Sequence, residues 1–202
     1  MNRRQVLAGI GAVCVSALPG CATVVGETRL GRPTVEAERD GATHVTFSDG
    51  GELTTSSLYS DGVDDRGRFD LRSDTWHRDG TRLDSARFAF RDARTAYGGR
   101  DAGSIPSLKL YLGTPGGYPF PKVYFDRGDD HEWSILEIPD LGVQGGSTLS
   151  LEFIGQVFHD YRPVLLDFDL RLELSETGLL GGGYVAETVQ RIEVPVEEST
   201  SD

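Results

Sequence analysis

The densest group of potential ligand side chains in this sequence is an acidic loop over residues 126–132. It holds four carboxylates, on Asp126, Asp129, Asp130 and Glu132. Ca²⁺ takes about six to eight oxygen ligands, so these residues form a candidate calcium site. Their spacing is not that of an EF-hand, however, and acidic loops are common in acidic proteins. We therefore favour a solvated turn and expect no bound metal or cofactor. The second acidic loop, residues 61–67, is interpreted in the same way.

The histidines offer acid–base chemistry, but they are scattered along the chain. His44, His77, His131 and His159 show none of the i,i+2 or i,i+4 spacings of a zinc site. His159 precedes Asp160, which would place a base beside an orienting carboxylate, yet no G-x-S-x-G nucleophile motif accompanies them. We therefore favour a non-catalytic protein. A hydrolase with an unrecognised site around His131 or His159 is kept as an alternative.

A further group of candidates is aromatic. Tyr97, Tyr118, Phe120 and Tyr124 lie beside or within segments rich in glycine and proline. An aromatic ring combines a large apolar face with a polar edge, and an exposed ring on a β-domain can stack on a sugar. More often, such residues pack in cores and turns. A carbohydrate- or solute-binding protein is therefore a second alternative.

The N-terminal segment carries chemistry of a different kind. Arg3 and Arg4 precede an uncharged apolar run over residues 6–18, and Cys21 follows directly after two small residues. The run is shorter than the ~20 apolar residues that cross a ~30 Å bilayer core. A basic start, a short apolar stretch and small residues at its end are typical of a secretory signal.

Two motifs in this segment resemble known export signals. Arg3-Arg4-Gln5-Val6-Leu7 resembles a twin-arginine export signal, and Leu18-Pro19-Gly20-Cys21 resembles the lipobox of prokaryotic lipoproteins. The resemblance implies that Cys21 becomes the first residue of the mature protein and that its sulfur carries a lipid. The alternatives are a plain cleavage site or an uncleaved anchor. We therefore expect the protein on the extracellular face of the cell membrane.

The composition limits the possible partners. The 202 residues include 32 Asp plus Glu against 20 Lys plus Arg, a formal net charge of −12, and the only lysines are Lys109 and Lys122. Nucleic acid and anionic lipid need basic patches, so this acidic surface argues against both. A Lys-poor, acidic composition resembles that of proteins from extremely salt-loving archaea, in which concentrated salt screens the self-repulsion.

The rest of the chain shows strand-like alternation. The clearest case is residues 164–174, where Leu and Phe at even positions alternate with charged residues, typical of an antiparallel strand with one buried face. Residues 83–94 also alternate and favour a strand over a helix. Residues 53–59 are rich in Thr and Ser, and the Ser-Asp-Gly sequence at 60–62 is expected to end that strand.

Roughly nine or ten such strands are expected, with turn residues between them and no convincing helix. Residues 70–77 are ambiguous, and Trp76 is their expected core anchor. The predicted fold class is an all-β antiparallel β-sandwich, jelly-roll or immunoglobulin-like, with an up-and-down barrel as the alternative.

The expected organisation is a signal peptide over residues 1–20, a lipidated tether over 21–33, a β-sandwich domain over 34–195 and a disordered acidic tail over 196–202. The signal, Cys21, the composition and the all-β body together resemble the twin-arginine-exported surface lipoproteins of haloarchaea, many of which have no assigned function. We therefore predict a non-catalytic, lipid-anchored extracellular β-domain that acts as a binding or envelope-interaction module. Its partner is an unknown protein or glycan.

Overall fold

The computed structural model describes residues 26–38, 42–94, 108–113, 124–126, 133–160, 162–178 and 181–196; for 124–126 it describes only the backbone. Within these ranges the chain forms strands joined by turns. None of the described residues belongs to a helix that is long and apolar enough to cross a membrane.

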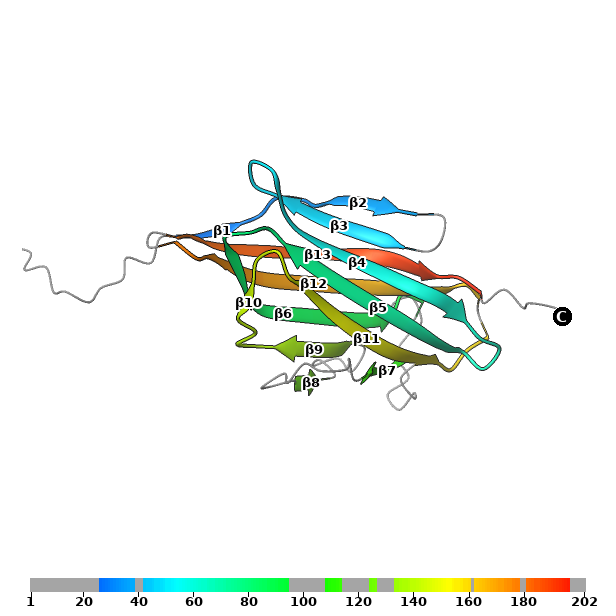
Figure 1. Cartoon of the computed structure of the whole chain (residues 1–202). Helices are drawn as coiled ribbons and strands as arrows, with labels where there is room; N and C mark the ends of the chain where they lie inside the picture. Colours follow the sequence, from blue (N-terminus) through cyan, green and yellow to red (C-terminus); the bar gives the residue numbers. More distant parts are fainter. Residues whose placement is uncertain are drawn as a thin grey trace, which may run out of the picture.

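The described strands form two sheets, shown in Figure 1. The strands of the first, sheet A, are β1 (Glu27–Arg29), β6 (Thr81–Asp92), β8 (Tyr124–Asp126), β9 (Ser134–Ile138), β10 (Val143–Gln144), β12 (Val164–Glu176) and β13 (Gly183–Val194). Their order across the sheet is β1-β13-β12-β6-β9-β8, and β10 also pairs with β6. The β1–β13 pairing is parallel, and the other pairings given for this sheet are antiparallel.

The second sheet, sheet B, lies against the first. Its strands are β2 (Thr34–Ala37), β3 (Thr43–Ser48), β4 (Glu52–Val63), β5 (Arg68–His77), β7 (Leu108–Gly113) and β11 (Thr148–Val157). Their order is β2-β3-β4-β5-β11-β7. In Figure 1, β4, β5 and β11 cross over β12 and β13, so the two sheets form two stacked layers. The predicted all-β sandwich is therefore confirmed, and the strands form two separate sheets instead of one closed barrel.

Alternation along the strands explains why the sheets pack face to face. In β12 the even positions from Leu166 to Leu174 are at most 2% exposed, while Asp169 and Arg171 lie on the opposite face and remain partly exposed. The strand predicted over 164–174 is confirmed. β6 likewise confirms the strand predicted over 83–94.

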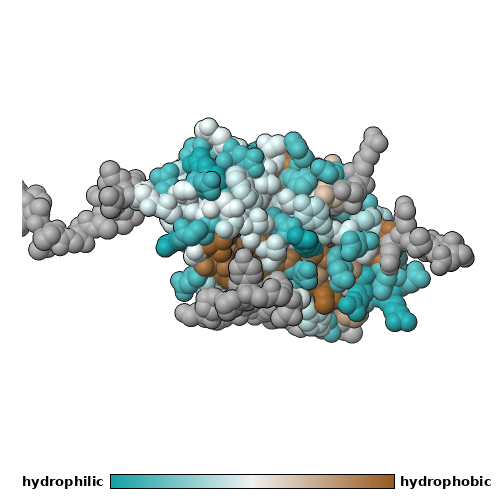
Figure 2. Space-filling model, viewed as in Figure 1, coloured by the Kyte–Doolittle hydropathy of each residue, from teal (hydrophilic) through white to brown (hydrophobic). Residues whose placement is uncertain are grey.

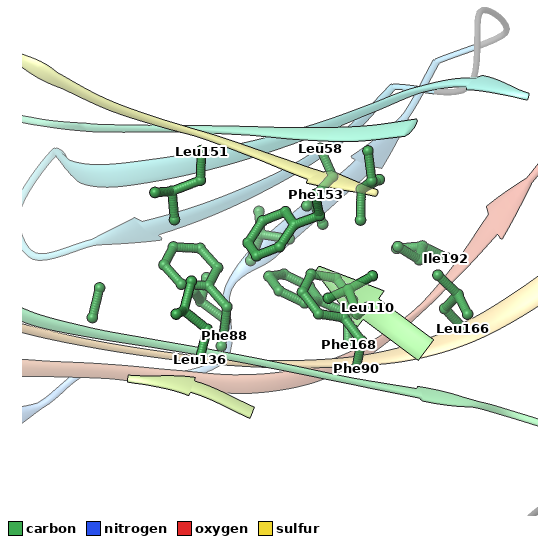
Figure 3. Packing of buried hydrophobic residues seen from close by; sticks show 14 of the residues in the cluster. Leu58, Phe88, Phe90, Leu110, Leu136, Leu151, Phe153, Leu166, Phe168 and Ile192 are labelled. Carbon is green, nitrogen blue, oxygen red and sulfur yellow. The ribbon is translucent and has the colours of Figure 1, made fainter. Parts of the chain in front are cut away.

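Phenylalanine rings fill the centre of the core. Phe88 and Phe90 from β6 contact Phe168 from β12 and, across the sandwich, Phe153 from β11 of the other sheet (Figure 3). The Phe90 ring centroid lies 5.0 Å from that of Phe168 and 5.2 Å from that of Phe153. Aromatic rings pack favourably at such separations, so this cluster fixes the distance between the two layers.

The described residues contain thirteen strands, more than the nine or ten expected. The additional strands are short, and such strands carry too few residues for alternation to show. β1 is one example: it lies inside the expected tether, over 21–33, and pairs in parallel with β13. All three of its side chains are exposed, so no apolar pattern marked it as a strand.

The expected end of a strand at residues 60–62 is wrong. β4 continues to Val63, and its register with β5 shifts between Ser60 and Val63. Gly62 has a φ of 108°, a conformation that residues with a Cβ rarely adopt. The glycine therefore allows a bulge within the strand and does not terminate it.

Trp76 does not anchor the core, so that prediction is also wrong. Phe69, Leu71 and His77 face the core from β5, which fixes the odd positions of this strand inward. Trp76 therefore points to the outer face of sheet B, where it is partly exposed.

Candidate functional site

Most of the candidate residues named from the sequence lie outside the described residues. These include Arg3, Arg4 and Cys21, the acidic-loop residues Asp129, Asp130 and Glu132, His131, and the aromatic residues Tyr97, Tyr118 and Phe120. Asp126 and Tyr124 belong to β8, whose side chains are not described. The export signal, the lipid anchor and the calcium candidate therefore remain predictions.

The second acidic loop is a tight turn between β4 and β5. One carboxylate oxygen of Asp64 accepts hydrogen bonds from the backbone N–H groups of Arg66 at 2.9 Å and Arg68 at 2.7 Å. Asp64 thus closes the turn, as Asp residues often do. Across the described part of the chain, no three His, Cys, Asp or Glu side chains gather closely enough to hold a metal ion.

His159 pairs with Asp92 and not with its neighbour Asp160. Its Nε2 lies 2.7 Å from a carboxylate oxygen of Asp92, which is 1% exposed. The other Asp92 oxygen accepts a hydrogen bond from the backbone N–H of Arg94. The pair joins the end of β6 to the connection between β11 and β12. It therefore ties the two sheets together at one end of the sandwich.

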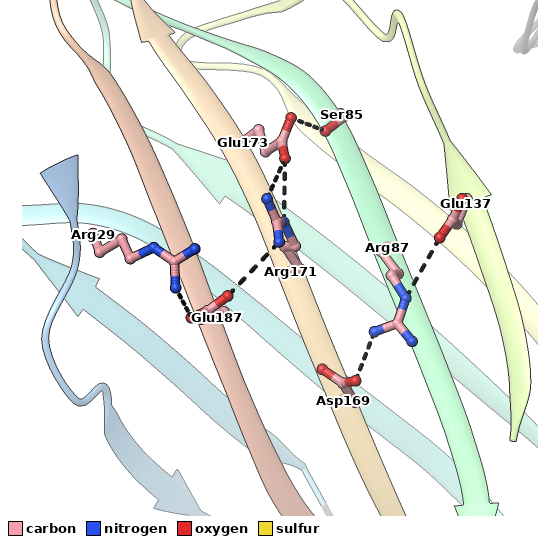
Figure 4. Close-up of polar contacts among 8 residues, drawn as sticks. All are labelled: Arg29, Ser85, Arg87, Glu137, Asp169, Arg171, Glu173 and Glu187. Atoms are coloured by element: carbon pink, nitrogen blue, oxygen red, sulfur yellow. Dashed lines mark hydrogen bonds and ion pairs between the residues drawn. The ribbon is translucent and has the colours of Figure 1, made fainter. Parts of the chain in front are cut away.

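The outer face of sheet A is covered by ion pairs, drawn in Figure 4. Arg87 Nη1 lies 2.6 Å from Asp169, Arg171 Nη2 lies 2.8 Å from Glu173, and Arg29 Nη1 lies 3.0 Å from Glu187. Hydrogen bonds from Arg171 and Ser85 hold the pKa of Glu173 below its usual value. The hollow of about 580 Å³ on this face is lined mainly by these side chains, which are bonded to one another.

Asp167 continues this network on the same face. It is buried between Arg91, whose Nε lies 3.0 Å away, and Arg191, whose Nη2 lies 2.9 Å away. The Arg91 guanidinium also lies 4.6 Å from the centre of the Trp133 ring. The charged groups of this face thus serve mainly to cross-link its strands.

The outer face of sheet B is chemically different, and we call it the hydroxyl face. One row across its strands is Thr34, Thr46, Thr55, Trp76 and Thr148. Thr46 Oγ1 and Thr55 Oγ1 share a hydrogen bond of 2.9 Å. Threonine suits a half-buried pleated surface because its branched side chain packs well there. Over β3 and β4, the surface in Figure 2 is mainly white and pale teal, the colours of intermediate hydropathy.

The next row of the hydroxyl face joins a serine, a histidine and a carboxylate. His44 Nδ1 lies 2.8 Å from Ser57 Oγ, and His44 Nε2 lies 3.4 Å from a carboxylate oxygen of Glu38. The ring of Tyr59 meets the His44 ring edge-on, with centroids 6.0 Å apart. Sequence reasoning missed this chain of contacts because it depends on the register that pairs His44 with Ser57.

A hollow of about 670 Å³ lies on the same face, over β4, β5, β7 and β11. Among the residues that line it are Tyr59, Asp70, Arg72, Asp74, Gly113 and Glu152. Arg72 forms a fork with Asp74, with contacts of 2.8 and 3.1 Å. Hydrogen bonding to Asp74 raises the pKa of Arg72, so the guanidinium stays charged.

Glycine helps to keep this hollow open at the β7 side. Gly113 pairs with Glu152, and a Cβ on Gly113 would lie 3.2 Å from the Cβ of Glu152. Two residues earlier on the same strand, Tyr111 is 56% exposed. The hydroxyl face therefore carries exposed aromatic rings and hydroxyl groups, and its concave part is lined by Tyr59 and by charged side chains that include the Arg72–Asp74 fork.

Comparison with known proteins identifies a family and only distant structural similarity. The family described as "Domain of unknown function (DUF8121)" matches residues 27–196. No curated protein matches the sequence.

Among solved structures, the seventh ScaB type I cohesin from Pseudobacteroides cellulosolvens is similar, with 12% identity and a TM-score of 0.42 over 72% of this chain and 95% of that chain. The cohesin module of a family 33 glycoside hydrolase from Clostridium perfringens has 11% identity and a TM-score of 0.41, over 84% and 100% of the two chains. The major pilin SpaD from Corynebacterium diphtheriae has 12% identity and a TM-score of 0.38, over 68% and 34%. These values are too low to assign a function.

Proposed function

The chain belongs to the DUF8121 family, and from this premise we propose that it is a non-catalytic binding module that uses the hydroxyl face to hold its partner. The observation that carries the proposal is the contrast between the two outer faces. On sheet A the charged side chains bind one another. On sheet B, a hollow of about 670 Å³ is lined by the exposed ring of Tyr59 and by charged side chains, of which Asp61 and Asp70 take part in no ion pair among the described residues.

The hydroxyl face has the properties of a binding surface. Binding sites are concave and combine aromatic side chains with a few placed polar groups. Tyr59 and the Arg72–Asp74 fork line the hollow, and the exposed Tyr111 projects from β7 on the same face. They project from paired strands, so they are held in place before a partner arrives, and little ordering entropy opposes binding.

The proposed location is the extracellular face of the cell membrane, where a lipid on Cys21 holds the protein. The support is the sequence alone, through Arg3, Arg4 and the lipobox-like residues before Cys21. We expect Cys21→Ser to release the protein into the medium or to leave it unprocessed. Cys14→Ser, inside the signal peptide, is the matched control and should leave membrane retention unchanged. Normal membrane retention of a processed Cys21→Ser protein would contradict lipid anchoring.

A hydrolase is the second candidate function, favoured by the contacts that join Ser57, His44 and Glu38. Serine hydrolases also need N–H groups free to stabilise an oxyanion. β4 is paired on both sides, with β3 and β5, so the backbone N–H groups beside Ser57 take part in sheet ladders. Because these N–H groups are engaged, we prefer the binding function to the hydrolase.

The hydrolase candidate is tested with a neutral ester substrate. An enzyme would be supported if the parent chain hydrolyses the ester, the Ser57→Ala variant does not, and the control variant Ser150→Ala still does. If hydrolysis is lost instead when both His131 and His159 are replaced, the result would support the alternative hydrolase site around these histidines. Absence of hydrolysis above background by the full chain would remove both versions.

The binding function is tested by thermal shift of the full chain in molar salt, against isolated cell-envelope material and a panel of solutes. A ligand at 100 times its Kd adds about 2.7 kcal/mol to the free energy of unfolding. For a chain of this size, that is a rise in Tm of roughly 5–10 °C. The rise should disappear in Tyr59→Ala and Tyr111→Ala and persist in Val189→Ala, whose exposed side chain belongs to sheet A. A rise that all three variants retain would place binding elsewhere.

A further inference from the structure

The hydroxyl face also indicates the class of its ligand. We propose that this face binds an extended neutral polysaccharide, with sugar rings lying on Tyr59, Trp76 and Tyr111 and sugar hydroxyls bonded to the side chains of the hollow. This inference rests on the proposed binding function and gives the chemical nature of the partner.

The aromatic side chains supply stacking surfaces. Tyr59 is 38% exposed and Tyr111 is 56% exposed, and Trp76 is partly exposed on the same face. Each projects from a different strand of sheet B: β4, β5 or β7. An exposed ring offers a flat apolar face, while the Tyr hydroxyl and the Trp N–H remain available for hydrogen bonds. A sugar ring has the matching character, with C–H groups on its faces and hydroxyls on its rim.

The polar side chains of the hollow suit hydroxyl groups. A sugar hydroxyl both donates and accepts, so it can bond to a guanidinium and to a carboxylate at the same time. Arg72 and Asp74 present such a donor and acceptor side by side, 2.8 Å apart. The carboxylates of Asp61 and Asp70 line the same hollow, and no ion pair among the described residues engages them.

The charge of the hollow excludes acidic ligands. Among the described residues, its charged side chains are Asp61, Arg68, Asp70, Arg72, Asp74 and Glu152. Four carboxylates and two guanidiniums give a net charge of −2. Phosphates and sugar acids would be repelled, because like charges across an interface cost binding free energy. A neutral polyol keeps every hydrogen bond and meets no repulsion.

The positions of the aromatic residues indicate a chain and not a single sugar. Tyr59 on β4 and Tyr111 on β7 are separated by three strand spacings, since β5 and β11 lie between them. At ~4.8 Å for each spacing, their separation across the strands is about 14 Å. Trp76 lies four residues along β5 from Arg72, the partner of Tyr59, which is about 13 Å at ~3.3 Å per residue. One monosaccharide cannot bridge such separations, whereas a linked series of rings can.

The two tryptophans of the chain provide a direct test. The full chain is titrated with neutral hexasaccharides built of glucose, mannose, galactose or N-acetylglucosamine, and tryptophan fluorescence is recorded. We expect a saturable change with at least one of them. The Trp76→Phe variant should lose the fluorescence change. The Trp133→Phe variant should keep it, because the Trp133 ring lies under Arg91 and away from the hydroxyl face. A change that Trp133→Phe removes and Trp76→Phe retains would overturn the proposal.

Affinity measured by calorimetry provides a second, independent readout. Tyr111→Ala should weaken hexasaccharide binding by about tenfold, equivalent to 1.4 kcal/mol. Val189→Ala, equally exposed on sheet A, should bind like the parent chain. The monosaccharides should show no saturable binding. Saturation by a monosaccharide, or equal affinities in both variants, would contradict an extended chain lying on the aromatic rings.

The remaining outcomes separate this inference from the proposed function. If an oligolysine peptide binds at the hydroxyl face and no hexasaccharide does, the acidic hollow selects a cationic partner and the polysaccharide is wrong. If no hexasaccharide binds but cell-envelope material still raises Tm in a Tyr111-dependent manner, the polysaccharide is again wrong and the binding function stands. If neither a hexasaccharide nor the cell-envelope material raises Tm, the polysaccharide proposal and the proposed binding function both fail.

Discussion

At the scale of single residues, His77 is a buried titratable group with a clear consequence. It lies in the core, where its Nδ1 is 2.8 Å from Thr81 Oγ1 and its Nε2 has no hydrogen-bond partner among the described residues. Burial lowers the pKa of His77 below its usual value, because the charged form loses its hydration. In the unfolded chain, the same side chain titrates near a pH of about 6.5.

This shift predicts a loss of stability in mild acid. Below a pH of about 6.5 the unfolded chain binds a proton that the folded chain does not, so the free energy of unfolding falls as pH falls. The slope from one such group is at most about 1.4 kcal/mol per pH unit. In His77→Gln this part of the slope should vanish, as urea denaturation at pH 7.5, 6.5 and 5.5 would show. The control variant His44→Gln, altered at the surface, should keep this part of the slope. An unchanged slope in His77→Gln would contradict the prediction.

Asp167 is the residue whose loss should most disturb the face of sheet A. It accepts from Arg91 and Arg191, and only 7% of its side chain is exposed. Asp167→Asn would leave two guanidiniums facing each other without the charge between them. We expect the free energy of unfolding of Asp167→Asn to fall by about 2–3 kcal/mol. Breaking a buried ion pair is costly, but both arginines stay partly solvated. Asp169→Asn, more exposed, is the control and should cost less than about 1 kcal/mol by denaturant titration.

The residue scale is also where the sequence was least informative. His44 and Ser57 are adjacent only because β3 and β4 pair in one register, and nothing in the spacing of the two residues indicates that register. Trp76 was wrongly expected in the core because large aromatic residues are usually buried. Its neighbours Leu71 and His77 decide its orientation, and the alternation that they set is the stronger signal.

At the scale of elements, the pairing of β5 with β11 depends on one glycine. Gly155 lies opposite Phe69, and the Phe69 ring covers the space that a Cβ on Gly155 would need. Gly155→Ala should therefore destabilise the protein by about 1–3 kcal/mol through overpacking. Gly178→Ala is the control, because no atom of the described residues lies within 4 Å of its added Cβ. Equal Tm values for the two variants would mean that Phe69 moves aside without cost.

The long strands are the elements that the sequence predicts well. β6 and β12 each bury alternate apolar residues over many positions, so their period is clear. β1 and β10 span three and two residues and bury none of their side chains fully. They form because a neighbouring strand offers unpaired backbone groups, which no local pattern encodes. The hydroxyl face was likewise hidden, since it is assembled from outward-facing positions on the six strands of sheet B.

At the scale of the whole molecule, charge and salt decide how stable the sandwich is. The net charge of −12 repels itself over long distances, whereas the ion pairs of sheet A act at 2.6–3.9 Å. The Debye length falls from ~10 Å at 0.1 M salt to ~3 Å at 1 M. Salt therefore removes the long-range repulsion more completely than it weakens the partly buried pairs.

We accordingly propose that the full chain becomes more stable as salt increases from 0.1 to 2 M, as its acidic, Lys-poor composition predicts. A gain of about 2 kcal/mol would raise Tm by roughly 4–8 °C for a chain of this size. Replacing exposed Asp65 and Glu193 by Lys changes the net charge from −12 to −8, since each change adds two charges. This variant should gain less from salt than Asp65→Glu/Glu193→Asp, which keeps the charge. A Tm that falls with salt would show that the surface ion pairs outweigh the self-repulsion, and it would contradict the proposed salt adaptation.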